Sequence, residues 1–372
     1  MDQNVQFKKL PPVWLINIIN EFRQFLLRVH RKSYPPNIVL YEIFQHFWLM
    51  PCLRVAAELN VAAIVENDPK SPIQLADVTK SDPENLFRII RALSTHGIFT
   101  FDDLGRIMNT DISRTLIDGK DSMRPMILQH LGKLNWTVFN ELGYTVKTGL
   151  NAFKKVNGKN IYDYLPENPA ESILFDRSIS NLTQISLEPL LNAYDFSKYK
   201  TIVDIGGGEG LLLSAILQRN PNLQGILYDL PEGLKNSTNV IQQYGVSDRM
   251  KVEPGNFFES VPQGADAYLL KNVLHNWSDD DCIKILTHIR DTIPADGKLL
   301  VVEMVIEKDL KPSLGKLIDV QMMVYTKGGR ERTRKQFRRI IGKSGFNILR
   351  YVPTIAPLSI IEAQKFPIRN LK

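Results

Sequence analysis

The chain has 372 residues, 44% of them hydrophobic and 23% charged, which is typical of a globular protein with two or three domains. Its formal net charge is +6, and its two cysteines, Cys52 and Cys282, are too few for a disulfide framework or a zinc-site spacing. No apolar run is long enough to cross a bilayer, and the first residues lack the order of a signal peptide. We therefore expect no membrane partner and a reducing, cytoplasmic compartment.

The N-terminal region is expected to be helical. Residues 14–29 place apolar side chains near helical spacing, which favours packing against the rest of the protein or a second subunit over lying on a membrane. Residues 38–59 are apolar almost throughout, so this helix should be buried on most sides, at a subunit interface as readily as in a core. We place a helical extension at 1–37.

A winged-helix pattern follows. Ser71 and Asp82 are expected to cap two helices, because each is followed by a proline at the first helical position. Residues 98–108 then predict a hairpin. Such a module can read DNA, but the second helix begins with Asp82 and Glu84 where basic or amide side chains are needed. We expect no nucleic-acid partner, and we assign 38–190, with further helices at 129–164 and 175–191, to a dimerisation domain that roofs a substrate pocket.

From about residue 191 the pattern alternates between strands and helices, which predicts a doubly wound α/β domain over 191–372. Strands are expected at 201–205, 225–229, 249–253, 267–270 and 298–303. Helices are expected at 210–219, 231–244, 278–292 and 337–344. Residues 347–352 and 358–363 should form a closing antiparallel hairpin. Ligands of such sheets bind at the carboxyl ends of the strands.

The turn after the first strand narrows the choice of ligand. Its glycines stand at 206, 207, 208 and 210, and Leu211 occupies the third position of a dinucleotide fingerprint. Asp204 and Glu209 place carboxylates where a pyrophosphate would be disfavoured but an amine or sulfonium would be favoured. Asp229 ends the second strand about 20 residues further on, where a carboxylate can bind both ribose hydroxyls. Together these features indicate S-adenosylmethionine.

Polar residues also follow the other strands, and one of them is the best candidate for a general base. His275 comes just past a strand end, and an imidazole with a pKa of about 6.5 can accept a proton at neutral pH. Glu303 and Glu331 could orient the ring and stabilise its cation, as the acid does in a catalytic triad. A basic cluster at 327–339 is interpreted as a solvated helix face.

These residues resemble the class I S-adenosylmethionine-dependent O-methyltransferases of the plant caffeate type and their bacterial relatives, including hydroxyindole O-methyltransferase. The resemblance extends from about Ile38 onward. It depends on six motifs, at 203–210, 228–231, 255–258, 270–279, 302–303 and 328–333. The fold implied is a Rossmann-like methyltransferase domain with an N-terminal helical, winged-helix dimerisation domain, in a homodimer.

The resemblance also implies residue roles. The cofactor would be bound by Gly206, Gly207, Gly208, Asp229, Leu230, Asn256, Phe257 and Lys271. The general base would be His275, flanked by Glu303 and Glu331, and no metal is implied. The acceptor pocket would be lined by Phe175, Ile179 and Met323. This sequence departs from the family at Asn256 and Asn276, where the family usually has aspartate. Neither difference removes the expected general base, His275.

The expected function is transfer of a methyl group to a hydroxyl of a small aromatic or polyketide-like secondary metabolite. Three alternatives remain open. A relative that binds S-adenosylmethionine can instead decarboxylate, hydroxylate or catalyse a pericyclic step, and transfer can go to nitrogen or carbon. A DNA-binding regulator is the third.

Overall fold

The computed structural model describes residues 10–366, which form two compact units. One unit contains the described parts of Met1–Ile16, Val138–Glu167 and Ile185–Lys372, and the other contains Asn17–Thr137 and Asn168–Gln184. Three helices run from one unit into the other: α1 (Val13–Lys32), α8 (Lys133–Asn140) and α12 (Pro169–Ala193).

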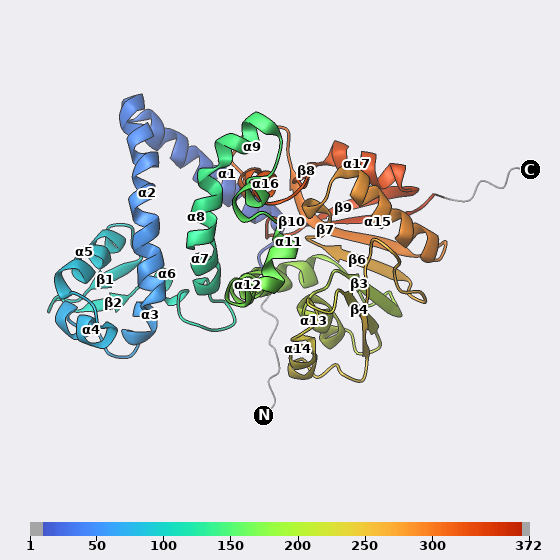
Figure 1. The fold of residues 1–372 in the computed structure, drawn as a ribbon, viewed down its shortest axis with the longest axis horizontal. Coiled ribbons are helices and arrows are strands. Elements are labelled where there is room, and N and C mark those ends of the chain that lie inside the picture. Colours follow the sequence, from blue (N-terminus) through green and yellow to red (C-terminus); the bar gives the residue numbers. More distant parts are fainter. Residues whose placement is uncertain (1–9, 367–372) are drawn as a thin grey trace, which may run out of the picture. The chain divides into compact units, whose positions relative to one another are not determined.

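The first unit is built on an eight-stranded sheet with the order β5-β4-β3-β6-β7-β10-β9, and β8 pairs with β7 off this path (Figure 1). Its strands are β3 (Thr201–Ile205), β4 (Gln224–Asp229), β5 (Met250–Pro254), β6 (Ala267–Lys271), β7 (Lys298–Ile306), β8 (Arg332–Thr333), β9 (Phe346–Pro353) and β10 (Leu358–Lys365). β3 to β8 pair in parallel, while β10 is antiparallel to both β7 and β9. The predicted doubly wound sheet and its closing hairpin are confirmed.

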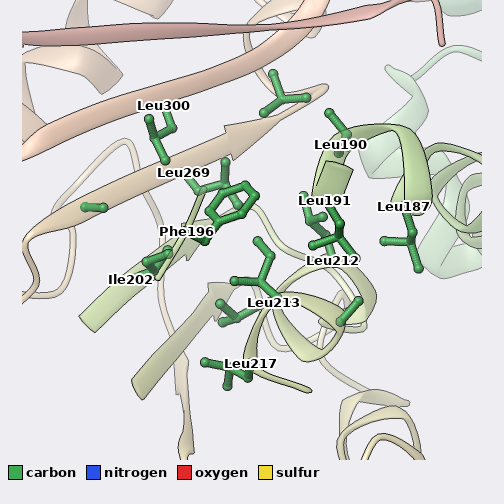
Figure 2. Packing of buried hydrophobic residues seen from close by; sticks show 14 of the residues in the cluster. Leu187, Leu190, Leu191, Phe196, Ile202, Leu212, Leu213, Leu217, Leu269 and Leu300 are labelled. Atoms are coloured by element: carbon green, nitrogen blue, oxygen red, sulfur yellow. The ribbon is translucent and has the colours of Figure 1, made fainter. Parts of the chain in front are cut away.

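Both faces of this sheet are buried. Figure 2 shows one face, where Ile202, Leu269 and Leu300 of the strands pack with Leu213 and Leu217 of the following helix. On the opposite face, the alternate strand residues form a second cluster with helices α15 (Asp279–Thr292) and α17 (Arg334–Lys343). Each leucine or isoleucine buried in this way stabilises the fold by about 1.5–3 kcal/mol, so the sheet holds the strand ends in fixed positions.

The helices of the first unit are α9 (Leu142–Thr148), α10 (Ala152–Asn157), α11 (Ile161–Tyr164), α13 (Leu211–Arg219), α14 (Ser237–Gln243), α15 (Asp279–Thr292), α16 (Leu314–Tyr325) and α17 (Arg334–Lys343), with 3₁₀ turns η1 (Leu165–Glu167) and η2 (Leu274–Asn276). The predicted helix 231–244 is wrong at its start, since α14 begins only at Ser237. Between β4 and Ser237 the chain folds over the end of β4 before it becomes helical. A Cβ at Gly233 would lie 2.9 Å from the Asp229 carboxyl carbon.

The second unit contains the winged-helix elements. Its helices and strands are α2 (Pro36–Glu58), α3 (Val61–Ile64), α4 (Pro72–Thr79), α5 (Pro83–Ser94), β1 (Phe99–Phe101), β2 (Ile107–Asn109), α6 (Asp111–Arg114) and α7 (Arg124–His130). Ser71 and Gln74 form a capping box at α4, and Asp82 accepts the Asn85 N–H at α5, so both predicted caps are confirmed. β1 and β2 form the predicted antiparallel hairpin.

Helix α2 is not buried within the single chain, contrary to the expectation for an all-apolar helix. Its buried residues are Ala56 and Ala57, whereas its aromatic residues Tyr41, Phe44, Phe47 and Trp48 are each more than half exposed. The exposure of these aromatic residues contradicts a core position for this part of α2.

Within residues 10–366, no helix has both the length and the apolar character needed to cross a membrane.

Candidate active site

The predicted site residues gather where the parallel strands end. β3 and β6 are buried almost throughout, but the residues at their carboxyl ends, such as Gly206 and Lys271, are only half-buried. The same holds for Asp229 at the end of β4 and Phe257 after β5, and Leu230 is 46% exposed. Since β5, β4, β3 and β6 are neighbours in that order, these strand ends form one accessible edge of the sheet.

The glycine turn is joined to Asp229 by its main chain. The N–H of Gly208 donates to Asp229 Oδ2 at 2.8 Å, and the N–H of Leu230 donates to Oδ1 at 2.7 Å. Burial raises the pKa of Asp229, while these two hydrogen bonds favour the ionised form. The structure thus brings Asp229 and the turn together, as the sequence predicted.

Three of the four glycines in the turn, Gly206, Gly207 and Gly208, have different roles. A Cβ at Gly207 would lie 2.5 Å from Leu227 and 2.9 Å from the Asp204 carboxyl group, and one at Gly206 would lie 2.9 Å from Val273. Gly208 has a φ of +57°, and nothing lies within 4 Å of the place where its Cβ would be. Gly206 and Gly207 therefore allow the turn to pack on the sheet, whereas Gly208 borders open space.

Asp204, by contrast, lies beneath the turn and is 2% exposed. Burial raises its pKa to about 7, against the opposing effect of the Lys271 charge on the neighbouring strand. Burial likewise lowers the pKa of Lys271 to about 8, opposed by Asp204 and Glu303. Lys271 is therefore electrostatically coupled both to the glycine turn and to the group around His275.

The loop after β5 carries the two residues expected at the adenine. Asn256 Oδ1 accepts the Phe258 N–H at 3.0 Å, and its Nδ2 donates to Glu259 Oε1 at 3.0 Å, so the amide holds its own loop. Phe257 reaches the glycine turn, because its Cε1 lies 3.6 Å from the place of a Gly206 Cβ.

Two aromatic residues extend this edge, and the sequence assigned neither of them a role. Trp277 makes an edge-on contact with Phe257, with ring centroids 6.1 Å apart. Tyr162 of α11 stacks on Trp277 at 6.0 Å, with 21° between the ring planes. Trp277 lies within the motif at 270–279, but no local pattern marks Tyr162, which comes from a segment more than 100 residues away in the sequence.

His275 lies on η2, directly after β6, and the structure joins it to both predicted acids. Its Nδ1 is 2.8 Å from Glu331 Oε1 and 3.9 Å from Glu303 Oε2. The His275 side chain is 16% exposed, whereas the Glu303 and Glu331 side chains are 0% and 1% exposed. With Nδ1 engaged by Glu331, Nε2 is the ring nitrogen left for another partner.

The charges of this cluster are mutually dependent. Burial lowers the pKa of His275, but Glu303 and Glu331 outweigh burial, so the net direction is upward. The pKa of Glu303 is raised to about 7, chiefly by burial; the charge of His275 opposes this rise, and the negative charge of Glu331 adds to it. Deprotonating the acids thus favours the imidazolium, and an imidazolium favours the carboxylates.

Glu303 also acts on the main chain. Its Oε1 accepts the N–H of Leu274 at 2.8 Å and that of His275 at 3.3 Å. Glu331 is held in turn, because its own N–H donates to Asp319 Oδ1 at 2.9 Å. The acids therefore fix both the ring and the turn that carries it.

The same three side chains are close enough to be considered as metal ligands. Among the described residues, one ligand atom each from His275, Glu303 and Glu331 lies within 4.8 Å of the others. The shortest of these separations, 2.8 Å, has the length of a hydrogen bond from an imidazole N–H to a carboxylate. A hydrogen-bonded base accounts for the geometry, and the absence of a metal stays a prediction.

The three residues predicted for the acceptor pocket fall in different units. Met323 lies on α16 in the unit that contains the sheet, and its side chain is 37% exposed. Phe175 and Ile179 lie on the part of α12 that belongs to the other unit, where Ile179 is 45% exposed. A shared pocket for the three remains a prediction.

Comparison with known proteins identifies the family to which this fold belongs. A model of the O-methyltransferase domain matches residues 139–347, and a model of the O-methyltransferase dimerisation domain matches residues 41–119. The phenazine O-methyltransferase PhzM of Lysobacter antibioticus is 36% identical over 331 residues, which cover 89% of this chain and 96% of that protein.

Solved structures agree. The crystal structure of LaPhzM superposes with a TM-score of 0.84 at 36% identity, covering 90% of this chain and 100% of that one. NcsB1, an O-methyltransferase from neocarzinostatin biosynthesis solved with S-adenosylmethionine and 2-hydroxy-5-methyl naphthoic acid, superposes with a TM-score of 0.72 at 28% identity, covering 85% and 96%. Fold and matches together define an S-adenosylmethionine-dependent methyltransferase. The chain belongs to the O-methyltransferase family and carries that family's dimerisation domain.

Proposed function

We propose that this protein transfers the methyl group of S-adenosylmethionine to a hydroxyl oxygen of a small aromatic acceptor, with His275 as the general base. The observation that carries the proposal is the hydrogen bond from His275 Nδ1 to the buried Glu331, with Glu303 beside it. Because Nδ1 donates its hydrogen to Glu331, Nε2 remains as the proton acceptor of the ring. The aromatic acceptor class is supported by the similarity to NcsB1, whose structure contains a naphthoic acid.

The cofactor would be held at the edge formed by β3, β4, β5 and β6. We assign its ribose to Asp229, because that carboxylate is half-buried and already oriented by two main-chain N–H groups. The open side of Gly208 leaves room for the methionine end, and Phe257 and Leu230 offer apolar surface to the adenine. When bound, the cofactor supplies an electrophilic methyl group on a sulfonium.

Proton removal explains why the base needs two acids. A phenol has a pKa of about 10 and an imidazolium about 6.5, so complete transfer before attack would cost about 5 kcal/mol. His275 would instead accept the proton through Nε2 while the C–O bond forms and the C–S bond breaks. Glu331 and Glu303 would stabilise the imidazolium at that moment, and such help contributes about 10²–10⁴ in rate.

The acceptor pocket and the assembly complete the proposal. We assign Met323, Phe175 and Ile179 to the acceptor pocket, and Asn256 and Lys271 to the cofactor's surroundings. We also propose a homodimer, supported by the match to the dimerisation domain and by the exposed aromatic residues of α2.

Incubation with methyl-labelled S-adenosylmethionine and a panel of hydroxylated naphthoates, phenazines and benzoates tests the function. Label recovered as an aryl methyl ether supports the proposal. Label on nitrogen or carbon would contradict the hydroxyl oxygen as the acceptor atom and indicate N- or C-methylation. Consumption of an acceptor without incorporation of label would overturn it in favour of a relative that uses the bound cofactor without transferring its methyl.

A further inference from the structure

Arg332 directly follows Glu331 in the sequence, and its guanidinium is completely buried. The sequence predicted that the basic cluster at 327–339 is a solvated helix face, and for Arg332 this prediction is wrong. A cation taken out of water destabilises the fold unless its donors are satisfied. The partners of Arg332 therefore indicate what it does.

Those partners surround the turn that carries His275. Nη1 of Arg332 donates to the Leu274 carbonyl at 2.7 Å, and Nη2 donates to the Trp277 carbonyl at 2.8 Å. Nε and Nη2 both lie 3.0 Å from Asp279 Oδ1, at the first residue of α15. One planar guanidinium thus ties residues on both sides of His275 to the start of the next helix.

The opposite side of the same turn is held by Glu303, which accepts the N–H groups of Leu274 and His275. The segment before Glu331 also lies against the turn, since a Cβ at Gly329 would be 2.5 Å from the His275 carbonyl oxygen. The main chain of the turn is therefore fixed through its N–H groups by an acid and through its carbonyls by Arg332. Glu331 separately fixes the ring.

We propose that Arg332 is a positioning residue for the general base: it holds the turn 274–277 so that the His275 imidazole stays in register with Glu331 and Glu303. The inference rests on the proposed role of His275. Lysine cannot replace this residue, because a single ammonium lacks the planar fork that serves two carbonyls and a carboxylate at once.

The first test compares Arg332→Lys, which keeps the charge and loses the fork, with Arg334→Lys as a matched control. Arg334 is half-exposed and pairs with Glu307 at the surface. A misplacement of about 1 Å in a catalytic group costs about 10²-fold in rate. We expect kcat of Arg332→Lys to fall by about that factor, with the Kd for S-adenosylhomocysteine unchanged by calorimetry. Arg334→Lys should behave as the wild type.

The second test measures the pKa of His275 and does not require catalytic turnover. The charged groups acting on the imidazole are Glu303, Glu331 and Lys271, and the two acids dominate. If Arg332→Lys releases the turn, the ring moves away from the acids and its pKa falls towards the ordinary value of about 6.5. NMR titration of ¹⁵N-histidine-labelled protein bound to S-adenosylhomocysteine measures this, with the resonance assigned by His275→Asn.

A wild-type protein that binds S-adenosylhomocysteine but transfers no methyl group would contradict the proposed function, and the NMR comparison would still test Arg332. Should Arg332→Lys fail to fold, Asp279→Asn takes its place, since it loosens the guanidinium at a side chain that is 18% exposed. Arg339→Ala, which removes the other partner of Asp279, is its control. A folded Arg332→Lys or Asp279→Asn protein with wild-type kcat and histidine titration would overturn the proposal.

Discussion

The two halves of the candidate active site are built in different ways. At the cofactor edge, a glycine turn and Asp229 meet through main-chain hydrogen bonds, and the residues involved lie within about 25 positions of one another. Around the base, His275, Glu303 and Glu331 come from three separate segments, and their charges depend on one another. The first half depends mainly on backbone shape, and the second on buried charge.

This difference predicts which property each half controls. Changes at the glycine turn and at Asp229 should alter cofactor affinity or stability and leave the protonation of His275 unchanged, since Lys271 is the cofactor-edge residue whose charge acts on the imidazole. Changes around the base should alter kcat and its pH dependence and leave cofactor affinity alone. Substitutions at His275, Glu331, Asp229 and Gly207 test this division.

His275→Asn should have the largest effect. Loss of the general base is expected to lower kcat by about 10²–10⁴, while calorimetry with S-adenosylhomocysteine should give the wild-type Kd. His96→Asn, at an exposed histidine, is the control. A His275→Asn protein that keeps the wild-type kcat would assign the base to another residue.

Glu331→Gln should lower kcat by about 10²-fold, since a hydrogen bond to a charged group contributes about 1.5–3 kcal/mol. Its pH profile is more informative. Glu331 raises the pKa of His275, and the rate is lost as the pH falls through that pKa because His275 must be neutral to accept a proton. Without Glu331 the pKa falls, so the acid limb of kcat should move to lower pH.

Glu307→Gln, at an acid that is 60% exposed, is the control for this profile. An acid limb of Glu331→Gln that stays in place or moves to higher pH would show that Glu331 does not set the protonation of the base.

Asp229→Asn should weaken cofactor binding by about tenfold, the lower end expected for loss of a charged hydrogen bond. At saturating cofactor, kcat and its acid limb should match those of the wild type. Glu232→Gln, at an exposed acid three residues further on, should change neither. A shift of the acid limb in Asp229→Asn would show that the two halves are electrostatically coupled.

Gly207→Ala should lower the stability of the fold and have little effect on the chemical step. Its Cβ would lie 2.5 Å from Leu227, and overpacking of this kind costs about 1–3 kcal/mol. Urea unfolding of Gly207→Ala and Gly119→Ala measures the effect, since nothing lies within 4 Å of a Cβ at Gly119. Equal midpoints for the two variants would show that the turn can move away from the sheet.

Local sequence signals were sufficient to predict the elements that depend on neighbouring residues. The strands and helices around residues 201–219, the caps at Ser71 and Asp82, and the closing hairpin are confirmed because their signals lie within a few residues of each element. The link between Asp229 and the glycine turn belongs to the same class, since a parallel βαβ unit brings its two strand ends together.

The remaining features depend on tertiary packing and could not be predicted from the sequence. The burial of Arg332 could not be predicted from the basic cluster, because a sequence shows charge but not burial. The late start of α14 follows from the chain folding over Asp229. The aromatic residues of α2 were expected to be covered, and whether a partner covers them is a property of the assembly. The shifted pKa values of His275 and Glu303 arise where segments distant in sequence exclude water together, and no local pattern encodes that exclusion.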